Sequence, residues 1–290
     1  MKHSLTPRGF ARNFLSRQWA AGVALCLSSV CAMAFESPAD GVYNDRIDWG
    51  LMMDLSGTAS ASQIPWVNGV KAYISKVNES GGVNGRKLQL ILRDDNANPG
   101  DAVRAAEELI AREQVDVLSG TFLSHVGLAV ADLARQRKMF FLAGEPLTDK
   151  VVWQNGNRYT FRLRASTYMQ VAMLVPEAAK LRKKRWAIVY PNYEYGQSAA
   201  ATFKQLLKAV QPDVEFVAEQ APALGKVDAG AVVQALADAK PDAIMNVLFE
   251  WVPQSLIRVS RLLSLVFEVG KMLCRFGLRG TTPSSWVSIW

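Results

Sequence analysis

The chain has 290 residues, of which 50% are hydrophobic, and a formal net charge of +7. The excess lies at the two ends: residues 1–34 hold four basic side chains and no acid, residues 251–290 hold five basic side chains and one acid, and residues 35–250 hold 24 basic and 25 acidic ones. The body of the chain is therefore nearly neutral and lacks the basic surface that a nucleic-acid backbone requires, so no nucleic-acid partner is expected.

The first 34 residues predict export. The cationic start is followed by an uncharged apolar stretch at residues 19–30 and by Ala32-Met33-Ala34, which is the order of a secretory signal peptide with a small-residue cleavage site. We expect cleavage after Ala34 and a periplasmic mature protein. The apolar stretch is shorter than the roughly 20 residues of a membrane-spanning helix, which argues against an anchor.

The three cysteines predict a mature chain without a disulfide. Cys26 and Cys31 lie in the predicted signal peptide, and Val30 is bulkier than the small residue that precedes a lipoprotein cysteine. Only Cys274 remains after cleavage, so no intramolecular disulfide is possible. Stability must then come from buried apolar surface.

Short apolar runs alternate with helical periodicity from residue 47 to about 249, which is typical of βα units and a parallel sheet. The apolar runs predict strands at residues 47–53, 87–93, 115–118, 139–143, 186–190, 214–218 and 242–249. Helices are predicted at residues 62–79 and 99–112, after Ser124, at residues 167–181, after Gly196, and at residues 229–239. The fold class is therefore α/β with doubly wound parallel sheets, in which ligands bind beyond the carboxyl ends of the strands.

A turn signal divides the predicted elements into two groups. Asn155-Gly156-Asn157 precede an alternating run at residues 159–163, where the chain is expected to cross from one lobe to the other. We predict a first lobe at residues 35–163 and a second lobe at residues 164–249. Residues 250–290 then form an atypical tail, with many serines and no clear strand-turn-helix unit.

Several motifs resemble one known family. The most specific is the run at residues 78–86 (NESGGVNGR), supported by Asp54-Leu55-Ser56-Gly57 after the first strand and by Tyr195-Gly196 after the fifth. This pattern, over about residues 45–249, resembles the leucine/isoleucine/valine-binding protein family of type I periplasmic receptors. Residues 161–170 and 190–196 resemble members that also serve aromatic acids.

The resemblance implies a function and a fold. It implies a two-lobed periplasmic-binding-protein type I fold that captures branched-chain amino acids or related small carboxylates, including aromatic acids, without catalysis and without a cofactor. The loaded protein would dock on the permease subunits of an ABC importer. A periplasmic sensing module for a receptor kinase or chemoreceptor is the alternative. An exported α/β enzyme is disfavoured, because no nucleophile elbow, metal cluster or dinucleotide loop is recognisable.

Ser124 is the first candidate for the ligand's carboxylate. It follows a predicted strand and opens a predicted helix, so its hydroxyl and the free amides of the first turn could bind an anion together. A plain helix-capping serine is the other interpretation. The resemblance favours the ligand role, since the family uses the serine at this position for its ligand's carboxylate.

The remaining candidates come from three segments. In the family, the loop after the fourth strand gives a carbonyl and a hydroxyl-bearing residue to the ligand, and a tyrosine of the second lobe closes over it. The corresponding candidates here are Glu145, Leu147 and Thr148 in the loop, Thr167 and Tyr168 at the start of the second lobe, and Tyr195 as the closing tyrosine. Thr148 lies at or one place beyond the matching position, and Glu145 is either a partner for a ligand ammonium or a solvated loop acid.

Two other motifs were considered as sites and rejected. The run at residues 94–98 is faintly like a calcium loop, but Pro99 occupies the place of its sharp-turn glycine and Ala105 that of its bidentate acid, so a strand-end turn is predicted. His125 follows Ser124 directly, and adjacent helical residues point in different directions, which excludes a nucleophile and base pair.

In the family, roughly a hundred further residues follow the end of the match and complete the first lobe. The atypical tail is therefore interpreted as a frameshifted or otherwise altered reading of the gene.

Overall fold

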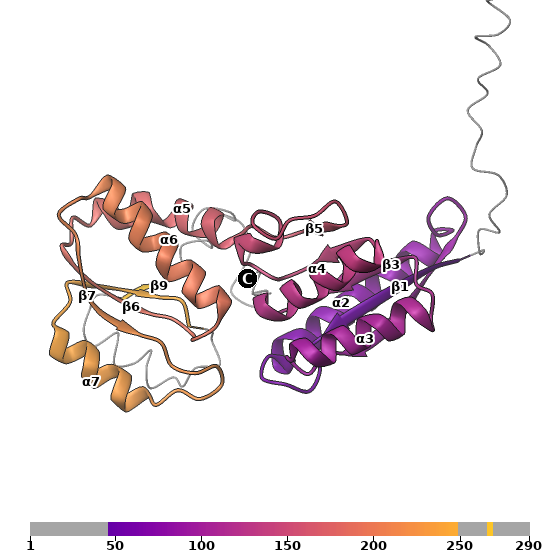
Figure 1. Ribbon diagram of the computed structural model, residues 1–290, viewed down its shortest axis with the longest axis horizontal. Coiled ribbons are helices and arrows are strands. Elements are labelled where there is room, and N and C mark those ends of the chain that lie inside the picture. Colours follow the sequence, from indigo (N-terminus) through magenta and orange to yellow (C-terminus); the bar gives the residue numbers. More distant parts are fainter. Residues whose placement is uncertain (1–45, 249–265, 269–290) are drawn as a thin grey trace, which may run out of the picture. The chain divides into compact units, whose positions relative to one another are not determined.

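The computed structural model describes residues 46–248 and the backbone of residues 266–268 (Figure 1). The predicted signal peptide and most of the tail lie outside these residues. The first sheet contains β1 (Arg46–Met53), β2 (Lys87–Asp94), β3 (Val117–Gly120), β4 (Phe141–Ala143) and β5 (Thr160–Arg162), in the order β2-β1-β3-β4-β5. The second contains β6 (Arg185–Val189), β7 (Glu215–Gln220), β8 (Ala243–Asn246) and β9 (Val266–Glu268), in the order β7-β6-β8-β9. All pairings are parallel.

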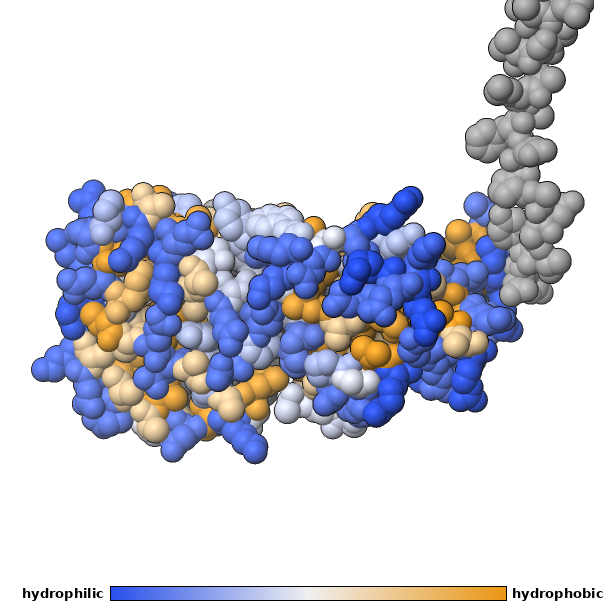
Figure 2. Space-filling view, viewed as in Figure 1, coloured by the Kyte–Doolittle hydropathy of each residue, from blue (hydrophilic) through white to orange (hydrophobic). Residues whose placement is uncertain are grey.

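Helices cover both faces of each sheet, as a doubly wound fold requires. They are α2 (Ser60–Glu79), α3 (Pro99–Ala111), α4 (Ser124–Arg137), α5 (Thr167–Lys180), α6 (Glu194–Val210) and α7 (Ala229–Ala239), with one 3₁₀ turn, η1 (Asp149–Val151). None of the described helices is both long and apolar enough to cross a membrane. In the view of Figure 2, hydrophilic residues cover most of the exposed face, and apolar residues interrupt it in small patches.

The period of two along each strand divides the apolar side chains between two cores. In β1, Met52 packs with α3 and α4, while Leu51 and Met53 pack with α2 on the opposite face. In β6, Trp186 and Ile188 pack with α5 and α6, and the intervening Ala187 and Val189 pack with α7. Residues 51–53 and 186–189 are apolar throughout because both faces of these strands are buried.

The glycine-rich run at residues 78–86 serves the fold. The Asn78 side chain donates to the carbonyl of Leu88 and accepts from its amide, both at 2.8 Å, which ties the end of α2 to β2. Gly82 has φ +85°, and a Cβ at this position would lie 2.1 Å from the carbonyl oxygen of Arg86. Only glycine fits this turn.

The predicted α/β class and all seven predicted strands are confirmed, with shifted ends. β3 starts at Val117 because the Val115 amide still closes α3, donating to the Leu109 carbonyl at 3.2 Å. α6 begins at Glu194 rather than after Gly196. β5 was not predicted as a strand, and β9 lies in the tail, where no strand was predicted.

Candidate functional site

The loop between β4 and η1 bonds to both Ser124 and Thr167. The Ser124 hydroxyl accepts the amides of Leu147 and Thr148, each at 3.2 Å. The Leu147 carbonyl accepts the amide of Thr167 at 2.8 Å and its hydroxyl at 2.9 Å. Four of the sequence-predicted site residues therefore share one hydrogen-bonded cluster at the carboxyl ends of β3 and β4.

Ser124 is not the cap of its helix. The N-cap position of α4 belongs to Leu123, and no side chain caps it. Ser124 is only 1% exposed, and its oxygen accepts the loop amides instead. The capping interpretation is thus wrong. A serine hydroxyl that accepts hydrogen bonds still has its own proton to donate.

Thr148 connects this loop to α6. Its side chain is buried, and its hydroxyl donates to Glu194 Oε1 at 2.8 Å. Lys150 Nζ binds the other oxygen of Glu194 at 2.9 Å. Arg162 holds the same loop by donating to the Thr148 carbonyl at 3.1 Å. Both the hydroxyl and the carbonyl of Thr148 are therefore occupied by protein groups.

Glu145 lies in the same loop and pairs with Arg164. A guanidinium nitrogen of Arg164 is 3.5 Å from Glu145 Oε2, and the two side chains are only 16% and 11% exposed. Burial raises the pKa of Glu145 although Arg164 and a hydrogen bond from Gln63 oppose the rise. Burial also lowers the pKa of Arg164 against the attraction of Glu145. Glu145 is not the solvated loop acid that one interpretation of the sequence allowed.

Tyr195 is close enough to Arg164 to interact with it electrostatically. Burial raises the pKa of Tyr195 to about 12, and the guanidinium acts against this rise. The phenol is consequently protonated at neutral pH. Its ring lies 6.1 Å from that of Tyr193, which packs against core residues of both sheets.

The side chain of Tyr168 does not join the cluster formed by the other predicted site residues. Its side chain is exposed, and its ring lies 5.6 Å from that of Trp153. Only its amide is engaged near the loop, donating to Asp149 Oδ2 at 2.9 Å. Thr167 and Tyr168 are neighbours on a helix, and neighbouring helical side chains point about 100° apart.

Three further residues contribute polar atoms near this cluster. His125 follows Ser124 in α4, Thr121 directly follows β3, and Gln63 lies in the first turn of α2 next to Glu145. His125 Nδ1, Thr121 Oγ1 and Gln63 Oε1 are buried and have no hydrogen-bond partner in the described part of the chain. Burial lowers the pKa of His125, so its ring tends toward the neutral form.

Sequence reasoning missed Arg164 and Gln63. Arg164 follows the alternating run of residues 159–163, at a place where a basic residue is usually exposed, and its contact with Glu145 depends on tertiary structure. Gln63 carried no signal beyond being a polar residue in the first turn of a predicted helix.

The family model for periplasmic binding protein matches residues 47–257, which is well over half of the chain. The chain belongs to the periplasmic binding protein family. The match agrees with the α/β model, whose two parallel sheets have helices on both faces.

Curated relatives include a Leu/Ile/Val-binding protein homolog of Brucella suis, 26% identical over 237 residues. The alignment covers 79% of this chain and 57% of the relative. BraC3 of Rhizobium johnstonii, a Leu/Ile/Val-binding protein, is 25% identical over 196 residues, which are 67% of this chain and 52% of that protein. The chain thus spans a little over half the length of these relatives.

Solved structures with the same fold include two with bound ligands. An ABC-transporter solute-binding protein of Rhodopseudomonas palustris in complex with 3,4-dihydroxybenzoic acid is similar at a TM-score of 0.69 and 28% identity, covering 77% of this chain and 61% of that one. LivJ of Streptococcus pneumoniae in complex with isoleucine is similar at a TM-score of 0.67 and 18% identity, covering 77% and 64%. Both have the periplasmic-binding-protein type I fold predicted for this chain.

Proposed function

We propose that the chain is the periplasmic solute-binding component of an ABC importer and captures a branched-chain amino acid or a related small carboxylate, including aromatic acids, without chemical change. Binding would draw together the two sheets with their helices, and the loaded form would dock on the permease. The proposal extends to this chain what the names of its relatives state for them.

One observation carries the proposal. Ser124, the loop of Leu147 and Thr148, and Thr167 form one hydrogen-bonded cluster, and the Glu145–Arg164 pair begins in the same loop. Such a cluster at the carboxyl ends of parallel strands is where α/β folds hold small ligands.

The charges at the site suit a ligand with a carboxylate. Arg164 and Glu145 are 3.5 Å apart, which is longer than the ~2.7–2.9 Å of a tight charge-assisted hydrogen bond. The guanidinium is planar and presents several donors, so it can bind a second carboxylate while it stays near Glu145. In an amino acid the ammonium would lie toward Glu145 and the carboxylate toward Arg164. An aromatic acid would use Arg164 alone.

Buried polar atoms without partners support a ligand at this place. His125 Nδ1, Thr121 Oγ1 and Gln63 Oε1 all belong to the elements around the cluster, and none has a partner among the described residues. A buried polar atom that stays unbonded costs on the order of 1–3 kcal/mol, so a polar ligand that reaches such atoms gains this energy.

Native mass spectrometry of the protein purified from periplasmic extract tests the proposal. The expected spectrum contains a bound species whose added mass, after release and fragmentation, is that of an amino acid or an aromatic acid. Recovery of the chain only from the cytosol, or an added mass that belongs to another chemical class, would contradict it.

A further inference from the structure

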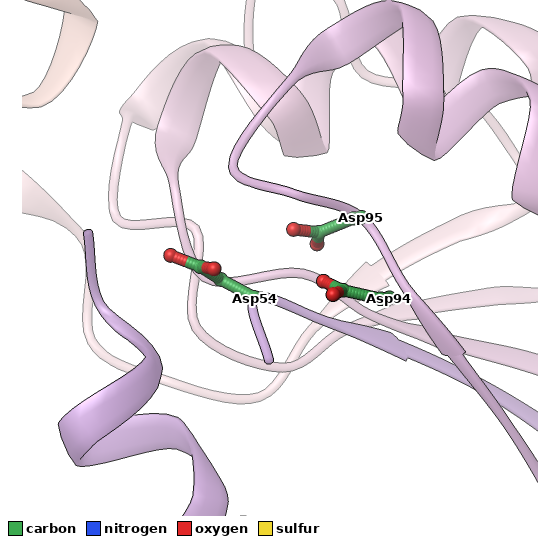
Figure 3. A group of neighbouring side chains, drawn as sticks. All are labelled: Asp54, Asp94 and Asp95. Atoms are coloured by element: carbon green, nitrogen blue, oxygen red, sulfur yellow. The ribbon is translucent and has the colours of Figure 1, made fainter. Parts of the chain in front are cut away.

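Three carboxylates from distant parts of the sequence meet at the edge of the first sheet. Asp54 follows β1, Asp94 ends β2, and Asp95 comes next, while the parallel pairing of the two strands aligns Met53 with Asp94. One oxygen of each carboxylate lies within 4.8 Å of the others. Figure 3 shows the three side chains gathered where the strands end.

Backbone amides satisfy most of these oxygens. Asp54 accepts the amides of Gly57 at 2.5 Å and Ala59 at 2.7 Å. Asp94 Oδ1 accepts two amides at 2.9 Å, and Asp95 Oδ1 accepts the amide of Ala97 at 3.0 Å. Within residues 46–248, no lysine or arginine forms a salt bridge with any of the three carboxylates.

One carboxylate oxygen of Asp95 accepts none of these hydrogen bonds. The residue is only 1% exposed, and its Oδ2 has no hydrogen-bond partner among the described residues. Its carboxylate extends toward the space beside Asp54 and Asp94 (Figure 3). Burying a charged oxygen without a partner is costly. A positive group bound next to Asp95 would lower this cost, and the described residues do not supply one.

We propose that Asp54, Asp94 and Asp95 bind a divalent cation, and that this cation is Ca²⁺. The donors are oxygens only, which suits a hard cation. With Ca²⁺ at its usual distance of ~2.3–2.6 Å from oxygen, two ligands on opposite sides of the ion are at most about 5 Å apart, which accommodates the 4.8 Å limit of this cluster. The irregular arrangement of one buried loop and two strand ends suits the flexible coordination of Ca²⁺ better than the octahedron of Mg²⁺.

This site is separate from the proposed ligand site but borders it through α2. Asp54 holds the amides of Gly57 and Ala59, which lead directly into that helix. Gln63, in its first turn, bonds to Glu145. A cation at Asp54 would therefore stiffen the segment that positions Gln63.

The sequence pattern alone did not indicate this arrangement. The run at residues 94–98 fails as a calcium loop because its glycine and its last acid are missing, and the third carboxylate, Asp54, comes from a separate strand end. Tertiary structure, rather than a contiguous loop, forms the cluster.

The test uses the full chain after treatment with a chelator and dialysis. Calorimetric titration with CaCl₂ is expected to show one saturable site, and Ca²⁺ is expected to raise the thermal midpoint more than Mg²⁺ does at the same ionic strength. The D95N variant should lose Ca²⁺ affinity by on the order of 100-fold, because the site loses one of three charges. It should also be more stable than the wild type in chelator, since an amide in place of this carboxylate removes the unpaired charge.

D132N is the matched control, because Asp132 is exposed and, among residues 46–248, forms a salt bridge only with Arg135 on α4. It should bind Ca²⁺ as the wild type does. D54N is a second variant that removes a charge from the site, and it should also weaken Ca²⁺ binding. If D54N fails to fold, the wild-type titration still decides whether the chain binds Ca²⁺. Equal thermal midpoints in Ca²⁺ and in chelator, with no heat of binding, would overturn the proposal. So would a wild-type midpoint that responds to pH through Asp95 but not to Ca²⁺, since a proton would then be the missing positive group.

Discussion

Arg164 and Glu145 lie 3.5 Å apart with both side chains largely buried. Burial raises the pKa of Glu145 and lowers the pKa of Arg164, so it favours the neutral form of each. The loss of hydration thus outweighs their mutual attraction, as is common for buried ion pairs. A ligand that supplies a further charge or hydrogen bond can improve such a pair. We therefore propose Arg164 of this pair as the group that receives the carboxylate of a ligand.

Replacing Arg164 should weaken ligand binding. We expect R164Q to reduce affinity for any carboxylate ligand by on the order of 100-fold, because a buried charge-assisted hydrogen bond is lost. R164K should recover part of the loss, since lysine keeps the charge but not the planar donor group. Titration calorimetry measures both. R104Q, on the exposed face of α3, is the control, and wild-type affinity in R164Q would exclude a role for Arg164 in binding.

Glu145 should make stability depend on pH in a predictable direction. Its folded-state pKa lies above the ordinary 4.5, so between these two values the folded chain holds a proton that the unfolded chain has released. The free energy of unfolding must therefore fall as pH rises through this window. Urea denaturation at closely spaced pH values should give a steeper decline for the wild type than for E145Q. Parallel profiles for the two proteins would show that Glu145 does not titrate in this way.

The Ser124 hydroxyl should matter for stability as well as for binding. S124A leaves the amides of Leu147 and Thr148 without their acceptor, which should cost about 1–3 kcal/mol of unfolding free energy. Chemical denaturation measures this loss. S75A, which removes an exposed hydroxyl bonded to Glu79 on α2, should be nearly neutral. Should S124A be as stable as S75A, the loop does not depend on this hydroxyl.

Tyr195 should contribute its hydroxyl to ligand binding. Y195F keeps the buried ring and should retain the fold, but ligand affinity should fall about tenfold, the effect of losing one hydrogen bond. Y73F, at an exposed position of α2, serves as the control. Fluorescence or calorimetric titration compares the two variants, and unchanged affinity in Y195F would leave Tyr195 with a packing role only.

Much of the fold could be predicted from local pattern. The apolar runs in β1 and β6 are buried on both faces, and such runs are legible in the sequence without knowledge of their neighbours. β5 was missed because it is three residues long and Phe161 and Leu163 around its end are exposed. β9, which pairs with β8, was missed because the tail shows no clear strand-turn-helix pattern.

The candidate site was predicted where position along a strand and helix determines it, and missed where tertiary contact does. Ser124 and the loop of Thr148 follow from their places after β3 and β4. The pairing of Arg164 with Glu145 depends on tertiary structure, and Asp54 meets Asp95 because β1 and β2 pair. A sequence pattern contains no record of such pairings between distant segments.

Calorimetric titration of the wild-type protein with isoleucine and, separately, with 3,4-dihydroxybenzoate tests the central claim most directly. We predict saturable one-to-one binding of at least one of them. A protein that is folded by circular dichroism but gives no saturable heat with either, or with leucine, valine and benzoate, would contradict the claim that this chain captures small carboxylates.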